Sequence, residues 1–86
     1  MKKTWSDKAW EDYLYWQTQD KKTLRRINQM ILENDRCPYE GIGRPEPLKH
    51  ERRGYWSRRI DEKNRLIYRI ENNIIEIIQC RAHYDD

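Results

Sequence analysis

The chain has 86 residues, of which 38% are charged and 36% hydrophobic, and its formal net charge is +3. This length allows one small core, so we predict a single domain over residues 1–86. The two cysteines, Cys37 and Cys80, are too few for a disulfide scaffold and lack the spacing of metal ligands. No apolar stretch approaches the roughly 20 residues of a membrane span, so we expect a reduced cytoplasmic protein with no membrane partner.

The N-terminal half carries signals for one short strand and two helices. Residues 1–5 form a candidate strand that ends at Ser6, a good helix N-cap with Asp7 in the first turn. Asp20 can cap a second helix. Both segments have apolar residues at helical spacing. The two apolar stripes comprise Ala9, Trp10, Tyr13 and Leu14, and then Leu24, Ile27 and Ile31.

The C-terminal half reads as strands. Residues 37–47 contain all three prolines and two of the three glycines, which predicts a loop. Strand-like runs follow at 55–60, 65–70 and 74–82, and the short connections between them require antiparallel neighbours. We therefore expect an α+β fold in which two N-terminal helices pack on one face of a small twisted antiparallel sheet.

Positive charge is concentrated in the second half of the chain. Residues 44–69 contain nine Lys or Arg against four Asp or Glu, a balance of +5. A local excess of this kind is typical of a surface that meets phosphates, although uneven charge is also common in proteins that bind no nucleic acid.

The residues of this basic segment and of the C-terminus match the needs of RNA cleavage without a metal. A base must remove the proton of the 2′-hydroxyl, an acid must protonate the leaving 5′-oxygen, and cations must stabilise the charged phosphate. Glu46 and His83 can serve as base and acid, and Arg59 and Arg65 can supply the cations.

Each of these residues also has a purely structural interpretation. Glu46 could be a solvated loop carboxylate, and His83 a surface histidine. The arginines could form a solvated sheet face or pair with acidic neighbours; they are Arg58, Arg59 and Arg65. Tyr84 could stack on a base or close the edge of the core. Residue types and spacing alone therefore leave a binding protein and an enzyme both open.

Several motifs, taken together in order, carry a resemblance. They are WS at 5–6, WEDYLYW at 10–16, RPEPLKH at 44–50, GYWSRRI at 54–60, RLIY at 65–68 and CRAHY at 80–84. This combination resembles the YoeB toxins of the wider RelE superfamily, over essentially the whole chain. One departure is that Asp85 and Asp86 follow the His-Tyr pair at which the family usually ends.

The resemblance implies a toxin that cleaves messenger RNA in the A site of the 70S ribosome, without metal or cofactor. Glu46 would be the general base, His83 the general acid and Arg65 the main transition-state cation. The RNA-contacting residues would be Lys49, Arg59 and Arg58, with Tyr84 orienting the nucleotide.

The resemblance also implies a YefM-like antitoxin as a partner and a possible homodimer, with DNA contacted only through the antitoxin complex. Two alternatives remain open from the sequence. The chain could be a non-catalytic RNA- or ribosome-binding module, or a corepressor within the antitoxin complex.

Overall fold

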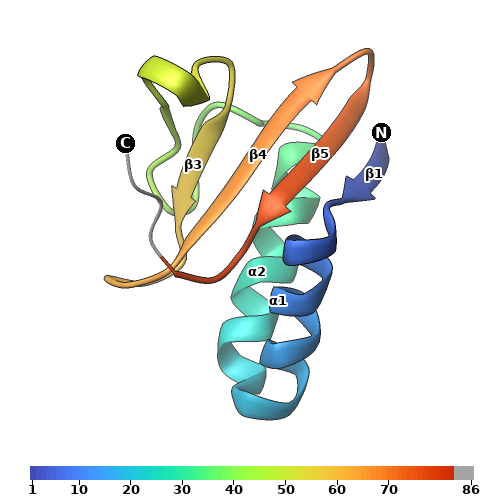
Figure 1. Ribbon diagram of the computed structural model, residues 1–86, viewed down its shortest axis with the longest axis vertical. Helices are drawn as coiled ribbons and strands as arrows, with labels where there is room; N and C mark the ends of the chain where they lie inside the picture. The colour runs from blue at the N-terminus through green and yellow to red at the C-terminus, as the bar shows by residue number, and fades with distance from the viewer. Residues whose placement is uncertain (83–86) are drawn as a thin grey trace.

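Two helices follow a short N-terminal strand, as the sequence predicts. The computed structural model describes residues 1–82, with α1 at Asp7–Gln19 and α2 at Lys21–Asn34 (Figure 1). The Ser6 hydroxyl caps α1 by accepting a hydrogen bond from the Ala9 amide at 3.0 Å. Asp20 ends α1 and caps α2, so a single residue connects the helices and makes them antiparallel neighbours.

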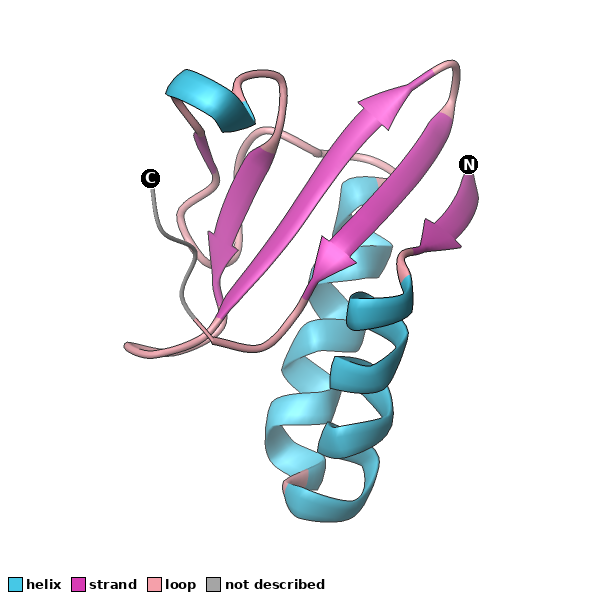
Figure 2. Cartoon of the chain, in the orientation of Figure 1, coloured by secondary structure: helices cyan, strands magenta, loops and turns pink. Residues whose placement is uncertain are grey.

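A five-stranded sheet lies against this helical pair (Figure 2). Its spatial order is β1-β5-β4-β3-β2. The strands are β1 (Lys2–Trp5), β2 (Glu46–Pro47), β3 (Trp56–Arg59), β4 (Arg65–Glu71) and β5 (Ile74–Gln79). One 3-10 turn, η1 (His50–Arg52), lies between β2 and β3.

The pairing confirms the two hairpins and corrects two details of the expected sheet. β3–β4 and β4–β5 are antiparallel, but β1 pairs with β5 in parallel, so the sheet is mixed. A parallel pair needs a long connection, which the intervening helices and strands supply. The expected loop also contains the two-residue strand β2, which lies at the edge of the sheet, where proline is tolerated.

The helices and the inner face of the sheet enclose the core. The sequence of β5 is apolar on both faces, so alternation alone did not predict which face is buried. In the structure Ile75 and Ile77 face the core. A β-bulge then changes the register, since Tyr68 pairs with Ile77 whereas Ile67 pairs with Gln79. The extra residue transfers Gln79 to the outer face, beside Ile67.

Arg58, which the sequence analysis assigned to RNA contact, lies inside the protein instead. Its side chain is 0% exposed and lies above the Tyr68 ring. Its Nε donates to Asn34 Oδ1 at 2.9 Å, and its Nη1 pairs with Glu33 Oε2 at 2.9 Å. Both Nη atoms also donate to loop carbonyls, those of Cys37, Glu40 and Ile42. The interpretation of Arg58 as an RNA contact is therefore corrected, because no donor face remains for a ligand.

The first helix holds the end of β5. Asp12 Oδ2 accepts from the Cys80 amide at 3.1 Å, and the Trp16 indole donates to the Cys80 carbonyl at 2.8 Å. Burial raises the pKa of the Cys80 thiol from 9.0 to about 12, and the Asp12 carboxylate adds to the rise. Cys80 is therefore a neutral core residue at ordinary pH.

Helices long and apolar enough to cross a bilayer are absent from residues 1–82.

Replacing Arg58 with Met should lower the free energy of unfolding by roughly 3–5 kcal/mol, because it leaves buried acceptors and the Glu33 carboxylate unpaired. Arg59→Met is the matched control, since Arg59 is exposed on the same strand and its loss should change stability by about 0.5 kcal/mol or less. Urea unfolding of both variants measures the difference. Equal stabilities would contradict the structural role of Arg58.

The raised pKa of Cys80 predicts a loss of stability in alkaline solution. The unfolded thiol ionises above pH 9.0, whereas the folded thiol stays protonated until about 12, so stability contributed by the neutral thiol declines between these values. Between pH 9.0 and about 12 the free energy of unfolding of the parent should fall by about 1.4 kcal/mol per pH unit more than that of Cys80→Ala. Urea unfolding from pH 8 upward measures this, and Cys37→Ala, which retains Cys80, should follow the parent.

Candidate functional site

The outer face of the sheet, opposite the helices, gathers the polar residues that the sequence analysis singled out. Glu46 on β2 lies opposite Ser57 on β3, and Arg59 lies opposite Arg65 on β4. Ser57 and Arg59 share this face because side chains alternate along a strand, whereas Arg58 between them points into the interior.

These side chains line a hollow of about 130 Å³, called here the Glu46 hollow. Its lining residues are Arg44, Glu46, Ser57, Arg59 and Arg65. One carboxylate therefore lies among three guanidiniums. Within residues 1–82 no ion pair ties Glu46 to any of these arginines, so the cations remain available to an anion placed between them.

A close backbone approach brings Arg44 to this hollow. The Arg59 amide donates to the Gly43 carbonyl at 2.6 Å. Gly43 has φ +78°, and a Cβ added there would lie 2.7 Å from the Arg59 carbonyl oxygen. Only glycine permits this contact, which sets the loop that carries Arg44 and Glu46 against the end of β3.

Arg65 is held in place by the turn that precedes it. Its Nη1 donates to the Asp61 carbonyl at 2.6 Å and to the Asn64 carbonyl at 3.1 Å. These bonds fix one edge of the guanidinium at the wall of the hollow, while its other donors remain free of that turn. A preorganised cation of this kind can stabilise developing charge without first being reoriented.

The last described residue, Ala82, is anchored beside Arg65. The Arg65 amide donates to the Ala82 carbonyl at 3.1 Å, and the Ala82 amide donates to Asn64 Oδ1 at 2.6 Å. Gln79 Nε2 also donates to the Ala82 carbonyl, at 3.2 Å. Arg81, one residue earlier, lies over the Tyr15 ring at 3.5 Å from its centroid. The chain is thus directed to the rim of the Glu46 hollow at its final described residue.

The predicted site residues divide into three groups. Glu46, Arg59 and Arg65 come together in the hollow. Lys49 is exposed at the start of η1 and is not among the lining residues. His83 and Tyr84 lie outside the described residues, as do Asp85 and Asp86.

The sequence analysis assigned no role to Arg44 and Ser57. The signal for both was present, since they belong to the RPEPLKH and GYWSRRI motifs. Strand alternation from Arg59 would also have placed Ser57 on the outer face.

The arrangement suits an anion with several oxygens. Guanidiniums bind phosphate through paired charge-assisted hydrogen bonds, and a carboxylate in their midst can accept a proton from a nearby hydroxyl. Over residues 1–82, His, Cys, Asp and Glu side chains form no group of three or more that could hold a metal ion.

A family model and curated relatives both match this chain over nearly its whole length. Residues 5–84 match the family model described as YoeB-like toxin of bacterial type II toxin-antitoxin system. The chain is 50% identical to Toxin YoeB of Escherichia coli K12 over 84 residues, which cover 98% of this chain and 100% of that protein.

Solved structures agree with this match. A YoeB/ParE toxin from Agrobacterium tumefaciens superposes with a TM-score of 0.95 at 44% identity, covering 98% of this chain and 100% of the other. Two structures from Staphylococcus aureus, a YoeB–YefM complex and a YoeB dimer, each reach a TM-score of 0.90, at 44% and 45% identity, with 98% of both chains covered.

Proposed function

The chain belongs to the YoeB-like toxins of bacterial type II toxin–antitoxin systems, and from this premise we propose that it is a metal-independent endoribonuclease that cleaves messenger RNA in the ribosomal A site and so inhibits translation. The observation that carries the proposal is the Glu46 hollow, where one carboxylate lies among three guanidiniums.

The proposed reaction begins at the ribose. Glu46 removes the proton of a 2′-hydroxyl, and that oxygen forms a bond to the adjacent phosphorus. The bond from phosphorus to the 5′-oxygen breaks, which leaves a 2′,3′-cyclic phosphate and a free 5′-hydroxyl. The base and the acid must lie on opposite sides of the phosphate for an in-line displacement.

The cations supply the electrostatic part of the mechanism. Negative charge builds up on the non-bridging phosphate oxygens in the transition state, and Arg65, fixed by the β3–β4 turn, is the main group to stabilise it. Arg59 and Arg44 hold the phosphate from the other walls of the hollow. Lys49, exposed near Glu46 in the chain, contacts the RNA backbone outside it.

The acid of this proposal is His83, which donates a proton to the leaving 5′-oxygen, and Tyr84 orients the nucleotide. The support for His83 is the position of Ala82, its neighbour in the chain. The carbonyl of Ala82 accepts a hydrogen bond from the amide of Arg65, a residue of the hollow. One peptide unit therefore separates the proposed acid from a residue anchored at the rim.

The proposed partners follow from the same family membership. The Staphylococcus aureus YoeB–YefM complex and YoeB dimer support a YefM-like antitoxin and a homodimer for this chain. The basic outer face suits the acidic, amphipathic segment of an antitoxin. DNA would be reached only through that complex, and the site of action would be the cytoplasm, where ribosomes translate.

A non-catalytic RNA- or ribosome-binding module is the second candidate, because the same basic face would bind RNA without cutting it. The two candidates differ in what a loss of Glu46 does. An enzyme loses its reaction, whereas a binder that loses one carboxylate beside three arginines keeps or gains affinity for RNA.

Replacing Glu46 with Ala or His83 with Gln should lower the cleavage rate by roughly 10²–10⁴, the usual contribution of a general base or acid. Primer extension on a defined message held on 70S ribosomes measures cuts at A-site codons, and ribosome pelleting measures binding in parallel. Binding should be retained in both variants. Intact ribosome binding by the parent without any cleavage would favour the binding module.

Loosening the anchor of Ala82 should slow cleavage without weakening RNA binding. Asn64→Ala and Gln79→Leu each remove a hydrogen bond to Ala82, and misplacement of a catalytic group by about 1 Å can cost up to about 10²-fold in rate. The measurement is the maximal rate at saturating ribosomes, with thermal unfolding as the check that the fold persists. If both variants fold and cleave at the parental rate, the anchoring of Ala82 does not position the acid.

A further inference from the structure

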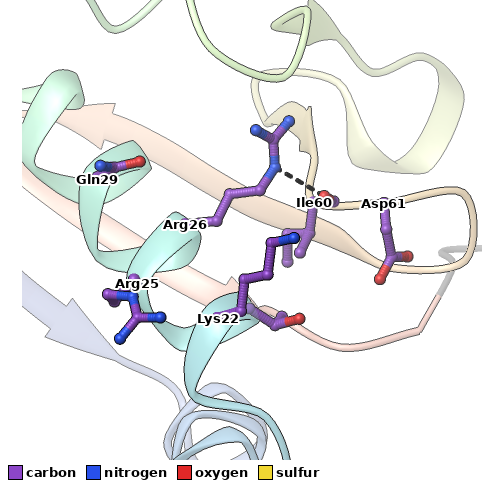
Figure 3. A pocket seen from close by; sticks show the side chains of 7 residues that line it. Lys22, Arg25, Arg26, Gln29, Ile60 and Asp61 are labelled. Atoms are coloured by element: carbon purple, nitrogen blue, oxygen red, sulfur yellow. Dashed lines mark hydrogen bonds between the residues drawn. The ribbon is translucent and has the colours of Figure 1, made fainter.

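A second basic hollow, larger than the first, lies between α2 and the turn that joins β3 to β4 (Figure 3). Its volume is about 460 Å³, and its charged lining residues are Lys22, Arg25, Arg26 and Asp61. We propose that this helix-side hollow binds phosphodiester groups of an RNA chain next to the Glu46 hollow. The proposal rests on the proposed function, because it extends the RNA path of the same site.

The charges that line the helix-side hollow favour an anion. Three cations line it together with one carboxylate, that of Asp61. Asp61 Oδ1 accepts hydrogen bonds from the amides of Lys63 and Asn64, each at 2.8 Å, and both carboxylate oxygens accept from Asn64 Nδ2 at 3.0 Å. This carboxylate is thus occupied by its own turn, and in Figure 3 it points away from the Arg26 guanidinium.

Arg26 connects the two hollows. Its Nε donates to the Ile60 carbonyl at 2.8 Å, and its Nη2 donates to the Arg59 carbonyl at 3.1 Å (Figure 3). Arg59 lines the Glu46 hollow, whereas Ile60 and Asp61 line the helix-side hollow. The end of β3, at Arg59 and Ile60, therefore lies between the two hollows.

Arg26 also has donors to spare. Its Nη1 donates to no group within residues 1–82, while the two bonds to β3 hold the guanidinium in place. In Figure 3 the Lys22 side chain reaches from the same helix toward Ile60, on the side where Arg26 crosses to β3. A fixed guanidinium and a flexible ammonium together make a suitable phosphate contact.

An RNA chain fits this pair of hollows better than an acidic protein segment does. A nucleic acid carries one negative charge at every nucleotide, so one strand can place phosphates in both hollows at the same time. Proteins that bind single strands place cations along the path of the backbone, and here the two sets of cations lie on either side of the end of β3. The strand is either the message or ribosomal RNA, which share the phosphodiester chemistry.

The test compares Lys22→Ala/Arg25→Ala with the control Lys2→Ala/Arg36→Ala, which removes two positive charges from β1 and from beyond the far end of α2. The probe is a 2′-O-methyl RNA oligonucleotide, which cannot be cleaved by 2′-hydroxyl attack. Fluorescence anisotropy across a salt series gives the dependence of affinity on salt. The slope of log affinity against log salt should become shallower by about 1.4, the value for two phosphate contacts on a single strand, whereas the control should follow the parent.

A second arm measures affinity for 70S ribosomes. Ribosomes with and without a bound message are compared: a loss of affinity for both identifies ribosomal RNA as the occupant, and a loss only for ribosomes that carry a message identifies the message. The proposal is overturned if the two double variants match in both arms, or if only binding of a polyglutamate peptide falls. Because the probe is never cleaved, these results are independent of whether the parent cuts RNA.

Discussion

The buried guanidinium of Arg58 is the contact on which the candidate site depends. A charge taken out of water must be matched by nearby acceptors. Arg58 finds them in Glu33 and Asn34 of α2 and in the carbonyls of the loop over residues 37–42. That loop leads through Gly43 to Glu46, so the interior ion pair decides where the proposed base meets β3.

Two neighbouring residues of β3 therefore have different roles. Arg58 points into the protein and stabilises it, whereas Arg59 points outward and lines the Glu46 hollow. The bulge on β5 works in the same way, because one extra residue transfers Gln79 to the outer face, where it holds Ala82. Strand alternation and the bulge together place these polar side chains on the outer face of the sheet.

Two anchored segments meet at the end of β3. On one side, Gly43 brings the loop with Glu46 against Arg59. On the other, α1 holds Cys80 and the turn at Asn64 holds Ala82. The loop that carries the proposed base and the chain leading to the proposed acid are thus held by separate contacts, and in-line displacement requires that the base and the acid lie on opposite sides of the phosphate.

The sequence by itself determined the helices, the two hairpins and the α+β class, because caps, apolar periodicity and turn lengths are short-range signals. Its motifs also pointed to Glu46, Arg59 and Arg65. Only the tertiary structure decided the parallel pairing of β1, the interior position of Arg58 and the bridge from Arg26 to β3. Whether an arginine faces solvent or an interior set of acceptors depends on which distant segment packs over it, and residues far apart in the chain carry no local pattern that reports this.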